Sequence, residues 1–295
     1  MPSIQSRLVN VVLHLIRMKK TVNRMQERIE NGERTYNEPT SKLHKKHVIT
    51  TEQHNGHKVW TVAPKENPGV LHVIYFHGGA YVNSFSPQHW TFISKLVEAL
   101  GCTVTAPDYP HAPEYCASDT MEMVFEVYKK LSGVTADVKI ALMGDSSGGG
   151  ISLALAQRLR DERLEQPGNI ILLSPWVDVT LSNPEIPALD KIDPFLGLEG
   201  MKWSGRAYAG NLDPMSPVVS PLYGSLKGLA PLSVFIGTRD IFLADCRKLK
   251  NKAEAEGATI NYHEYEGMIH DWMLGPLPES KRALNEIVER LRGTR

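Results

Sequence analysis

Residues 139–150, which read KIALMGDSSGGG, decide the fold of this 295-residue chain. An apolar run enters a Gly-x-Ser-x-Gly turn centred on Ser146, and a helical pattern follows it. A turn this tight needs neighbours with almost no side chain, which Gly144 and Gly148 supply. A turn that only caps a helix is the plainer alternative. The strand before the turn and the helix after it favour a nucleophile elbow, with the Ser146 hydroxyl held above the sheet edge.

Outward from this turn, short apolar runs alternate with helical patterns. The alternation predicts an α/β fold with right-handed crossovers, and strands that are apolar on both faces predict a mostly parallel sheet covered by helices on both sides. The eight expected strands are residues 47–52, 58–63, 70–76, 103–107, 139–143, 170–173, 232–236 and 259–265. The expected helices between them are residues 89–100, 120–131, 149–162, 241–256 and 280–292. Residues 47–295 are therefore expected to form one main domain.

Two segments depart from the alternation. Residues 1–46 carry apolar side chains in steps of four and three from Ile4 to Ile29, which predicts one long amphipathic helix or two in succession. Membrane adsorption and a coiled-coil dimer seam are alternatives. We favour packing on the protein's own body, because a pattern of fewer than four heptads without a strict charge pattern is weak evidence for a coiled coil. Residues 183–217 are too long for an ordinary connection and include a helical pattern over 198–209. We expect both segments to form a helical cap.

The composition excludes several classes of protein. Apolar residues make up 42% of the chain, and 33 Lys and Arg balance 33 Asp and Glu, so no overall charge draws the chain toward nucleic acid. Residues 1–47 alone carry ten basic and four acidic residues, a net charge of +6.

The apolar stretch 8–16 is far shorter than the ~20 residues that span a bilayer, which argues against stable membrane insertion. Three cysteines without close spacing favour a reducing compartment, so we expect a cytoplasmic protein. The sequence leaves open whether the protein forms a homodimer.

A serine becomes a strong nucleophile only beside a general base. Among eleven histidines, His270 follows the last expected strand and precedes the last expected helix. His72 and His77 are five residues apart on or beside one strand and should point to opposite faces, which argues against a metal pair. His111 and His263 have no partner visible in the sequence, so we expect them to be structural. His270 is therefore the predicted base, and no metal is predicted.

The base needs a carboxylate to orient it. Asp240 follows strand 232–236 at its carboxyl end, the edge where open α/β sheets bind ligands. Asp178 and Asp245 are the rivals, but Asp240 fits better by its position at the strand end. Asp271 is adjacent to the base in sequence, and we expect it to be unable to fold back to the ring. The predicted triad then has the chain order known for this arrangement: Ser146, Asp240, His270.

An oxyanion needs hydrogen-bond donors. Residues 71–81, which read LHVIYFHGGAY, form a strand that enters a Gly-Gly turn. Backbone N–H groups of such a turn can face a developing negative charge without side chains in the way, and the N–H of Ser147 would complete the set. A plain tight turn is the alternative, which the nearby elbow makes less attractive.

Taken together, these motifs resemble the hormone-sensitive-lipase-like branch of the α/β-hydrolases, which contains small bacterial carboxylesterases. The similarity covers residues 70–295. The matching motifs are HGGA at 77–80, GDSSGG at 144–149, DYPHAPE at 108–114, GTRD at 237–240 and HDW at 270–272. The resemblance implies an α/β-hydrolase catalytic domain at residues 47–295 and an oxyanion hole made by the amides of Gly79, Ala80 and Ser147, with Gly78 shaping the turn.

The chain departs from the family pattern at three places. Ala80 stands where the family has glycine, and we expect it to have an ordinary negative φ. Ser147 replaces alanine and adds a hydroxyl beside the nucleophile. Pro110 and His111 replace Arg-Leu, which leaves the structural contacts of that motif open.

The sequence predicts a serine carboxylesterase whose substrates are small-molecule esters with short acyl chains. No metal or organic cofactor is predicted. The same triad would serve an amidase, a formamidase or a peptidase. A ligand-binding relative without catalysis is a third option, which the complete set of catalytic residues argues against.

Overall fold

The structure is a computed structural model that describes residues 1–133 and 138–293. Within these ranges eight strands form one sheet in the order β1-β2-β4-β3-β5-β6-β7-β8. β1, β2 and β4 pair antiparallel, and the strands from β4 to β8 pair parallel. The predicted α/β fold with a mostly parallel eight-stranded sheet is confirmed.

The strands lie close to their predicted positions. They are β1 (Val48–His54), β2 (His57–Ala63), β3 (Leu71–Phe76), β4 (Thr103–Pro107), β5 (Lys139–Asp145), β6 (Asn169–Leu173), β7 (Leu232–Gly237) and β8 (Ile260–Tyr265). The first two form a hairpin in which Asn55 and Gly56 both have positive φ, as a two-residue turn between strands requires.

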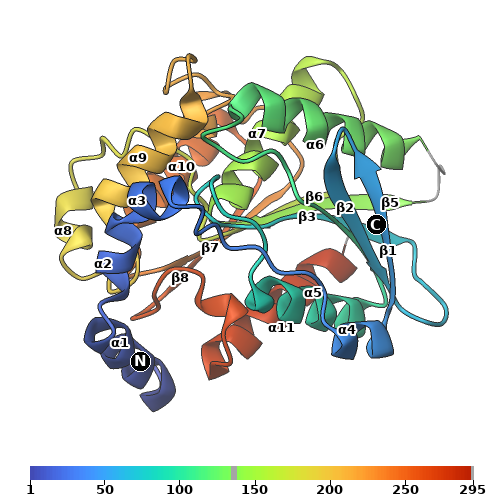
Figure 1. The fold of residues 1–295 in the computed structure, drawn as a ribbon. Coiled ribbons are helices and arrows are strands. Elements are labelled where there is room, and N and C mark those ends of the chain that lie inside the picture. Colours follow the sequence, from blue (N-terminus) through green and yellow to red (C-terminus); the bar gives the residue numbers. More distant parts are fainter. Residues whose placement is uncertain (134–137, 294–295) are drawn as a thin grey trace.

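Helices cover both faces of the sheet (Figure 1). They are α1 (Ile4–Leu15), α2 (Met18–Asn23), α3 (Met25–Glu30), α4 (Ser41–Lys46), α5 (Pro87–Leu100), α6 (Ala117–Ser132), α7 (Ser147–Asp161), α8 (Ile186–Asp190), α9 (Leu198–Ala209), α10 (Leu243–Glu256) and α11 (Pro278–Arg292). Two short 3₁₀ turns, Pro221–Tyr223 and Trp272–Leu274, complete the described elements.

Two apolar clusters fill the space between helices and sheet. One contains the inner faces of α6, α7 and α10, and the other contains those of α5 and α11. β3, β5, β6 and β7 run through the middle, and most of their side chains are buried. Burial on both faces explains why these strands read as continuous apolar runs in the sequence.

The N-terminal segment differs from the expected long helix. Residues 4–30, all of them described, form three short helices, and Arg17 interrupts the first two in a left-handed conformation (φ 53°). α2 and α3 pack on α9, where the backbone of Gly200 lies against Val22. α4 lies with α5 at the other side of the sheet, where Lys46 pairs with Glu98 at 2.7 Å.

The apolar stripe predicted for residues 4–29 packs on the protein along only half of its length. Val22, Met25 and Ile29 are buried under α9, as expected. The stripe residues of the first helix, Ile4, Leu8, Val11 and Leu15, face outward instead, because α1 turns its opposite side to the protein. The expectation that the whole stripe lies on the body is therefore wrong for α1. Among the described helices, none is both long enough and apolar enough to cross a membrane.

Candidate active site

Ser146 lies at the sharp turn between β5 and α7. Its backbone has φ 50° and ψ −118°, a strained conformation for a residue with a side chain. Its N–H donates to Leu173 of β6 at 2.8 Å and its carbonyl accepts from Trp176 at 2.9 Å, so both neighbours fix the turn. A Cβ at Gly148 would overlap the carbonyl oxygen of Phe76, which explains the glycine there. The local geometry is that of a nucleophile elbow.

Asp240 and His270 meet at the same edge of the sheet. Asp240 follows β7 and His270 follows β8, and both side chains are buried. His270 Nδ1 lies 2.8 Å from Asp240 Oδ2. The two rival carboxylates are engaged elsewhere: Asp245 accepts from Asn183, and Asp178 accepts from Tyr223.

Asp271 contacts the imidazole from the other side. Its Oδ2 lies 3.1 Å from His270 Nε2, so the expectation that Asp271 cannot reach the ring is wrong. The reason is the backbone of Asp271, whose left-handed conformation (φ 51°) folds the side chain back. In the part of the chain that the structure describes, no hydrogen bond joins the Ser146 hydroxyl to His270. The carboxylate of Asp271 instead contacts Nε2, the nitrogen to which a nucleophilic serine would donate its proton.

The two carboxylates control the charge of the imidazole. Burial by itself would lower the pKa of His270, but the charges and hydrogen bonds of Asp271 and Asp240 outweigh it and raise this pKa well above its usual value. Burial raises the pKa of Asp271 to about 7, helped by the negative charge of Asp145 and opposed by His270.

The turn after β3 runs beside the elbow. Gly79 has φ 135°, and a Cβ there would overlap the backbone of Asn83. Ala80 has φ 57°, so the expectation of a negative φ is wrong. The turn is held in this shape by Asn83, whose N–H donates to the carbonyl of Gly79 at 2.9 Å, and by Ala112, whose N–H donates to the carbonyl of Tyr81. These contacts impose a left-handed conformation on alanine at a cost of roughly 1 kcal/mol.

Asp145 connects this turn to the elbow, and sequence reasoning missed it. Its buried carboxylate accepts hydrogen bonds from the Gly78 N–H at 2.9 Å and from the Tyr75 hydroxyl at 2.5 Å, and it lies 3.2 Å from His89 Nε2. Burial would raise the pKa of Asp145, but the charge and hydrogen bonds of His89 and Tyr75 lower it. The position of an acidic residue directly before the nucleophile was the available signal. An ionised Asp145 fixes Gly78 relative to Ser146.

Asp193 makes a second connection that the sequence did not reveal. It belongs to the excursion 183–217, and its buried carboxylate accepts from the N–H groups of Phe195, Leu196 and Ile241. Ile241 follows Asp240 directly, so the excursion is fastened to the loop that carries the carboxylate partner of His270. Burial and the charge of Asp240 raise the pKa of Asp193 to about 7.

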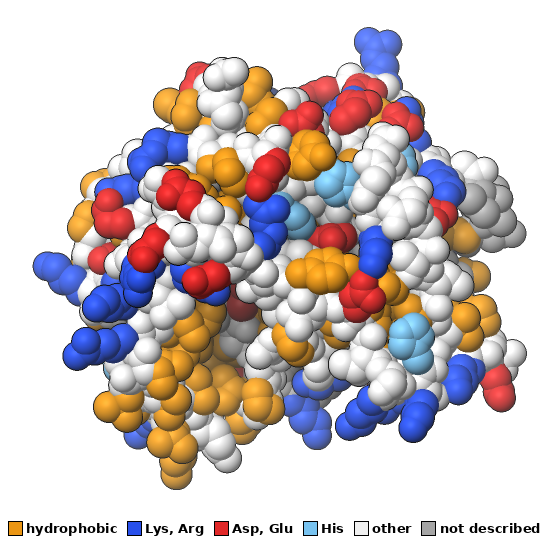
Figure 2. Space-filling view, in the orientation of Figure 1, with side chains coloured by type: hydrophobic (Ala, Val, Ile, Leu, Met, Phe, Trp, Pro, Cys, Tyr) orange, Lys and Arg blue, Asp and Glu red, His pale blue; other side chains and the backbone are white. Residues whose placement is uncertain are grey.

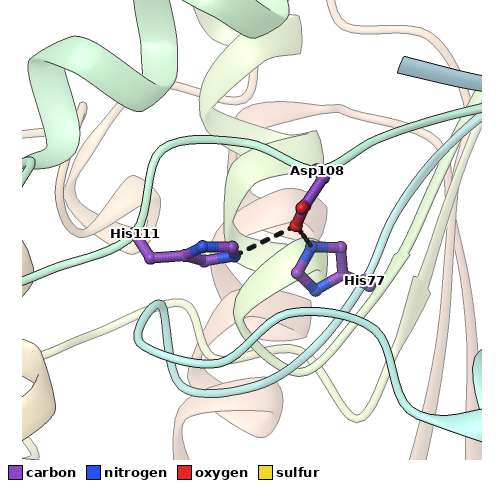
Figure 3. A group of neighbouring side chains, drawn as sticks. All are labelled: His77, Asp108 and His111. Atoms are coloured by element: carbon purple, nitrogen blue, oxygen red, sulfur yellow. Dashed lines mark ion pairs between the residues drawn. The ribbon is translucent and has the colours of Figure 1, made fainter. Parts of the chain in front are cut away.

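Three side chains near the turn after β3 could hold a metal ion. Figure 3 shows the imidazoles of His77 and His111 directed at the Asp108 carboxylate; each Nε2 lies 3.6 Å from Asp108 Oδ1. Both nitrogens are buried without a hydrogen-bond partner, and the three atoms form a group with metal-ligand spacing. His111, for which the sequence showed no partner, thus lies beside Asp108 and His77. Ser84 already donates to Asp108 Oδ1 at 2.6 Å, and His77 Nδ1 lies 2.8 Å from the Gly78 carbonyl, so the group also supports the turn without a metal.

The comparisons with known proteins agree with this geometry. The family model described as alpha/beta hydrolase fold matches residues 73–274. LipR of Mycobacterium tuberculosis is 35% identical over 227 residues, which cover 75% of this chain and 72% of LipR. An esterase of Acinetobacter venetianus is 31% identical over 221 residues, covering 74% of this chain and 73% of the esterase.

The chain belongs to the α/β-hydrolase family and is related to these esterases. Solved structures share this fold. A hormone-sensitive lipase from a metagenome library superimposes with a TM-score of 0.84, covering 98% of this chain and 99% of the lipase, at 23% identity, which shows the shared fold. The relation to LipR and the Acinetobacter esterase makes the chain a carboxylic ester hydrolase.

Proposed function

We propose that the protein is a serine carboxylesterase for short acyl esters, with Ser146 as nucleophile, His270 as base and Asp240 as the orienting acid. The observation that carries the proposal is the 2.8 Å contact between His270 Nδ1 and Asp240 Oδ2, made at the sheet edge where the elbow lies. An imidazole held at Nδ1 by a carboxylate can accept the serine proton at Nε2 once this nitrogen has left Asp271.

The reaction proceeds by acyl transfer. The Ser146 oxygen attacks the ester carbonyl while its proton moves to His270 Nε2, and the tetrahedral intermediate then collapses as this proton passes to the leaving alcohol. A water molecule repeats the sequence on the acyl-enzyme and releases the acid. Before the first step, His270 Nε2 must exchange its contact with Asp271 for one with Ser146.

The oxyanion would be bound by the N–H groups of Gly79, Ala80 and Ser147. The Gly78 N–H is not available, since it donates to Asp145. Gly78 therefore shapes the turn, and the next two residues offer their donors. Ser147 opens α7, whose N-terminus favours negative charge.

The proposed cap consists of α2, α3 and the excursion 183–217. This is narrower than the whole segment 1–46, because α4 lies at the other side of the sheet. Tyr208 of α9 stacks on Tyr81 with ring centroids 3.6 Å apart, and Tyr81 packs against Trp176. All three side chains are buried, and they lie next to the turn and the elbow. We infer that this aromatic cluster forms a wall of the acyl pocket and limits the length of the acyl chain.

A series of p-nitrophenyl esters from acetate to decanoate tests the substrate class. The specificity constant should be highest for acetate and butyrate and fall steeply for longer chains. Tyr208→Ala removes one ring of the wall and should recover part of the activity on longer esters, while Tyr115→Ala, an exposed residue, serves as control. A preference of the wild-type enzyme for decanoate would contradict the short-acyl proposal.

A further inference from the structure

α1 presents an uncovered apolar face. Ile4, Leu8, Val11, Val12, Leu15 and Ile16, called here the α1 face, are between 43% and 81% exposed. Figure 2 shows hydrophobic side chains gathered at the lower left, where Figure 1 places α1. Single exposed apolar residues are common, but six on one side of a 12-residue helix and its cap form a contiguous patch, which marks an interaction site.

The opposite side of α1 fixes this orientation. Its buried residues are Ser6, Asn10 and Leu13, two of them polar. Asn10 Nδ2 donates to the Gly267 carbonyl at 3.4 Å, and Ser3 donates to the Glu279 carboxylate through both its N–H and its hydroxyl. This orientation, with polar residues inward and apolar residues outward, indicates that the α1 face contacts a partner outside the chain.

The chain segment that carries the α1 face is cationic. Residues 1–26 contain five Lys and Arg and no Asp or Glu. Two hollows lie at the end of α1, and the first is lined by Ile16 together with Arg17 and Lys20. Arg24 and Arg28 also line it, but they pair with Glu27 and Glu33 of the same hollow. The second is lined by Leu13, Arg17 and Lys20, and by Lys19, which pairs with Asp190 at 2.7 Å. Among the described residues, Arg17 and Lys20 have no acidic partner, so these two cations beside the α1 face can contact anionic oxygen atoms.

We propose that α1 adsorbs to an anionic lipid bilayer, lying in the plane of the interface with the α1 face among the acyl chains. The cationic side chains around Arg17 and Lys20 then contact the phosphate groups of the lipids. The charges disfavour a second copy as the occupant, because a two-fold contact through this face would bring two cationic clusters together.

α1 is connected to the proposed active site through the loop that precedes His270. Asn10 contacts Gly267, three residues before His270, and Pro2 packs where a Cβ of Gly267 would lie. α1 therefore rests on the loop that carries the proposed base. A bilayer bound by α1 lies close to the site, which suits ester substrates that partition into lipid.

Sedimentation with vesicles tests the proposal on the full chain. Wild type should pellet with vesicles of phosphatidylglycerol and phosphatidylcholine, and much less with phosphatidylcholine alone or in high salt. Leu8→Ser with Leu15→Ser should abolish pelleting, and Arg17→Gln with Lys20→Gln should weaken it roughly 30-fold, since each cation contributes about fivefold near an anionic surface. The matched control, Leu164→Ser with Met215→Ser, changes two exposed apolar residues elsewhere and should pellet like wild type.

Turnover of soluble p-nitrophenyl acetate checks that each variant is folded, because none of the changed residues belongs to the proposed site. The proposal is overturned if wild type stays in the supernatant, or if the Leu8 and Leu15 variant pellets as well as wild type. It is also overturned if light scattering shows a wild-type dimer that the Leu8 and Leu15 changes dissociate while vesicles bind neither form.

Discussion

His270 and Asp271 are neighbours in sequence and also partners in space: Nε2 of the imidazole lies 3.1 Å from Oδ2 of the adjacent carboxylate. Nδ1 of the same ring lies 2.8 Å from Asp240 Oδ2. The imidazole is thus held between two buried carboxylates, and both raise its pKa against the effect of burial. A base held in this way keeps its proton to higher pH than an ordinary histidine.

Asp271→Asn should move the acid limb of the pH profile to lower pH. The base must be neutral to accept the serine proton, so activity rises as pH passes through the pKa of His270. The Asp271 carboxylate raises this pKa, and removing its charge lowers it. The specificity constant for p-nitrophenyl acetate between pH 4 and 9 measures the shift, with exposed Asp213→Asn as the control. An unchanged limb, or one displaced upward, would show that Asp271 does not act on the base.

Gly148→Ala should prevent the elbow from forming. The added Cβ would overlap backbone atoms of Phe76 and His77, which cannot move without displacing β3. We expect a loss of more than roughly 4 kcal/mol in the free energy of unfolding, or no folded protein. Gly133→Ala at the end of α6 is the matched control, because its Cβ would meet its neighbours at 3.4 Å or more. Urea denaturation compares the two, and equal stability would contradict the packing described for the elbow.

Ala80→Gly should leave the protein at least as stable as wild type. A left-handed conformation costs alanine roughly 1 kcal/mol, which glycine avoids, and this gain offsets the greater flexibility of glycine in the unfolded chain. The buried helical Ala253→Gly should instead lose about 1 kcal/mol. Thermal melting distinguishes the two positions. If both substitutions destabilise the protein equally, Ala80 does not have the positive φ that the turn requires.

Asp145→Asn should lower turnover while leaving most substrate binding intact. The carboxylate faces the Gly78 N–H, the Tyr75 hydroxyl and the His89 ring, and an amide can accept from only part of this set. A displaced turn loses oxyanion contacts, so we expect kcat to fall roughly 100- to 1000-fold with little change in KM. Glu122→Gln, an exposed change on α6, provides the comparison. A wild-type kcat for Asp145→Asn would exclude the positioning role.

The main architecture was predictable because its signals are local. Each buried strand is a continuous apolar run, and the residues around Ser146 combine a strand, a glycine-flanked turn and a helix within one short segment. The meeting of Asp240 with His270 was inferred from strand ends that share one edge of the sheet.

The parts that the sequence did not reveal depend on tertiary contacts. Ala80 takes a positive φ because Asn83 and Ala112 bind the backbone on either side of it. Asp271 reaches the ring through one backbone angle, which residue type alone does not determine. The direction of α1 depends on Asn10 finding Gly267, a partner far away in the sequence.

The most direct test of the central claim is covalent labelling of the nucleophile. A fluorophosphonate probe should modify the wild-type protein at one residue, and mapping by mass spectrometry should place the label on Ser146. Ser146→Ala should remove both the label and esterase turnover, by about a millionfold for turnover, whereas Ser147→Ala keeps its backbone N–H and should retain both. Labelling at another residue, or wild-type turnover of p-nitrophenyl acetate by Ser146→Ala, would contradict the proposed mechanism.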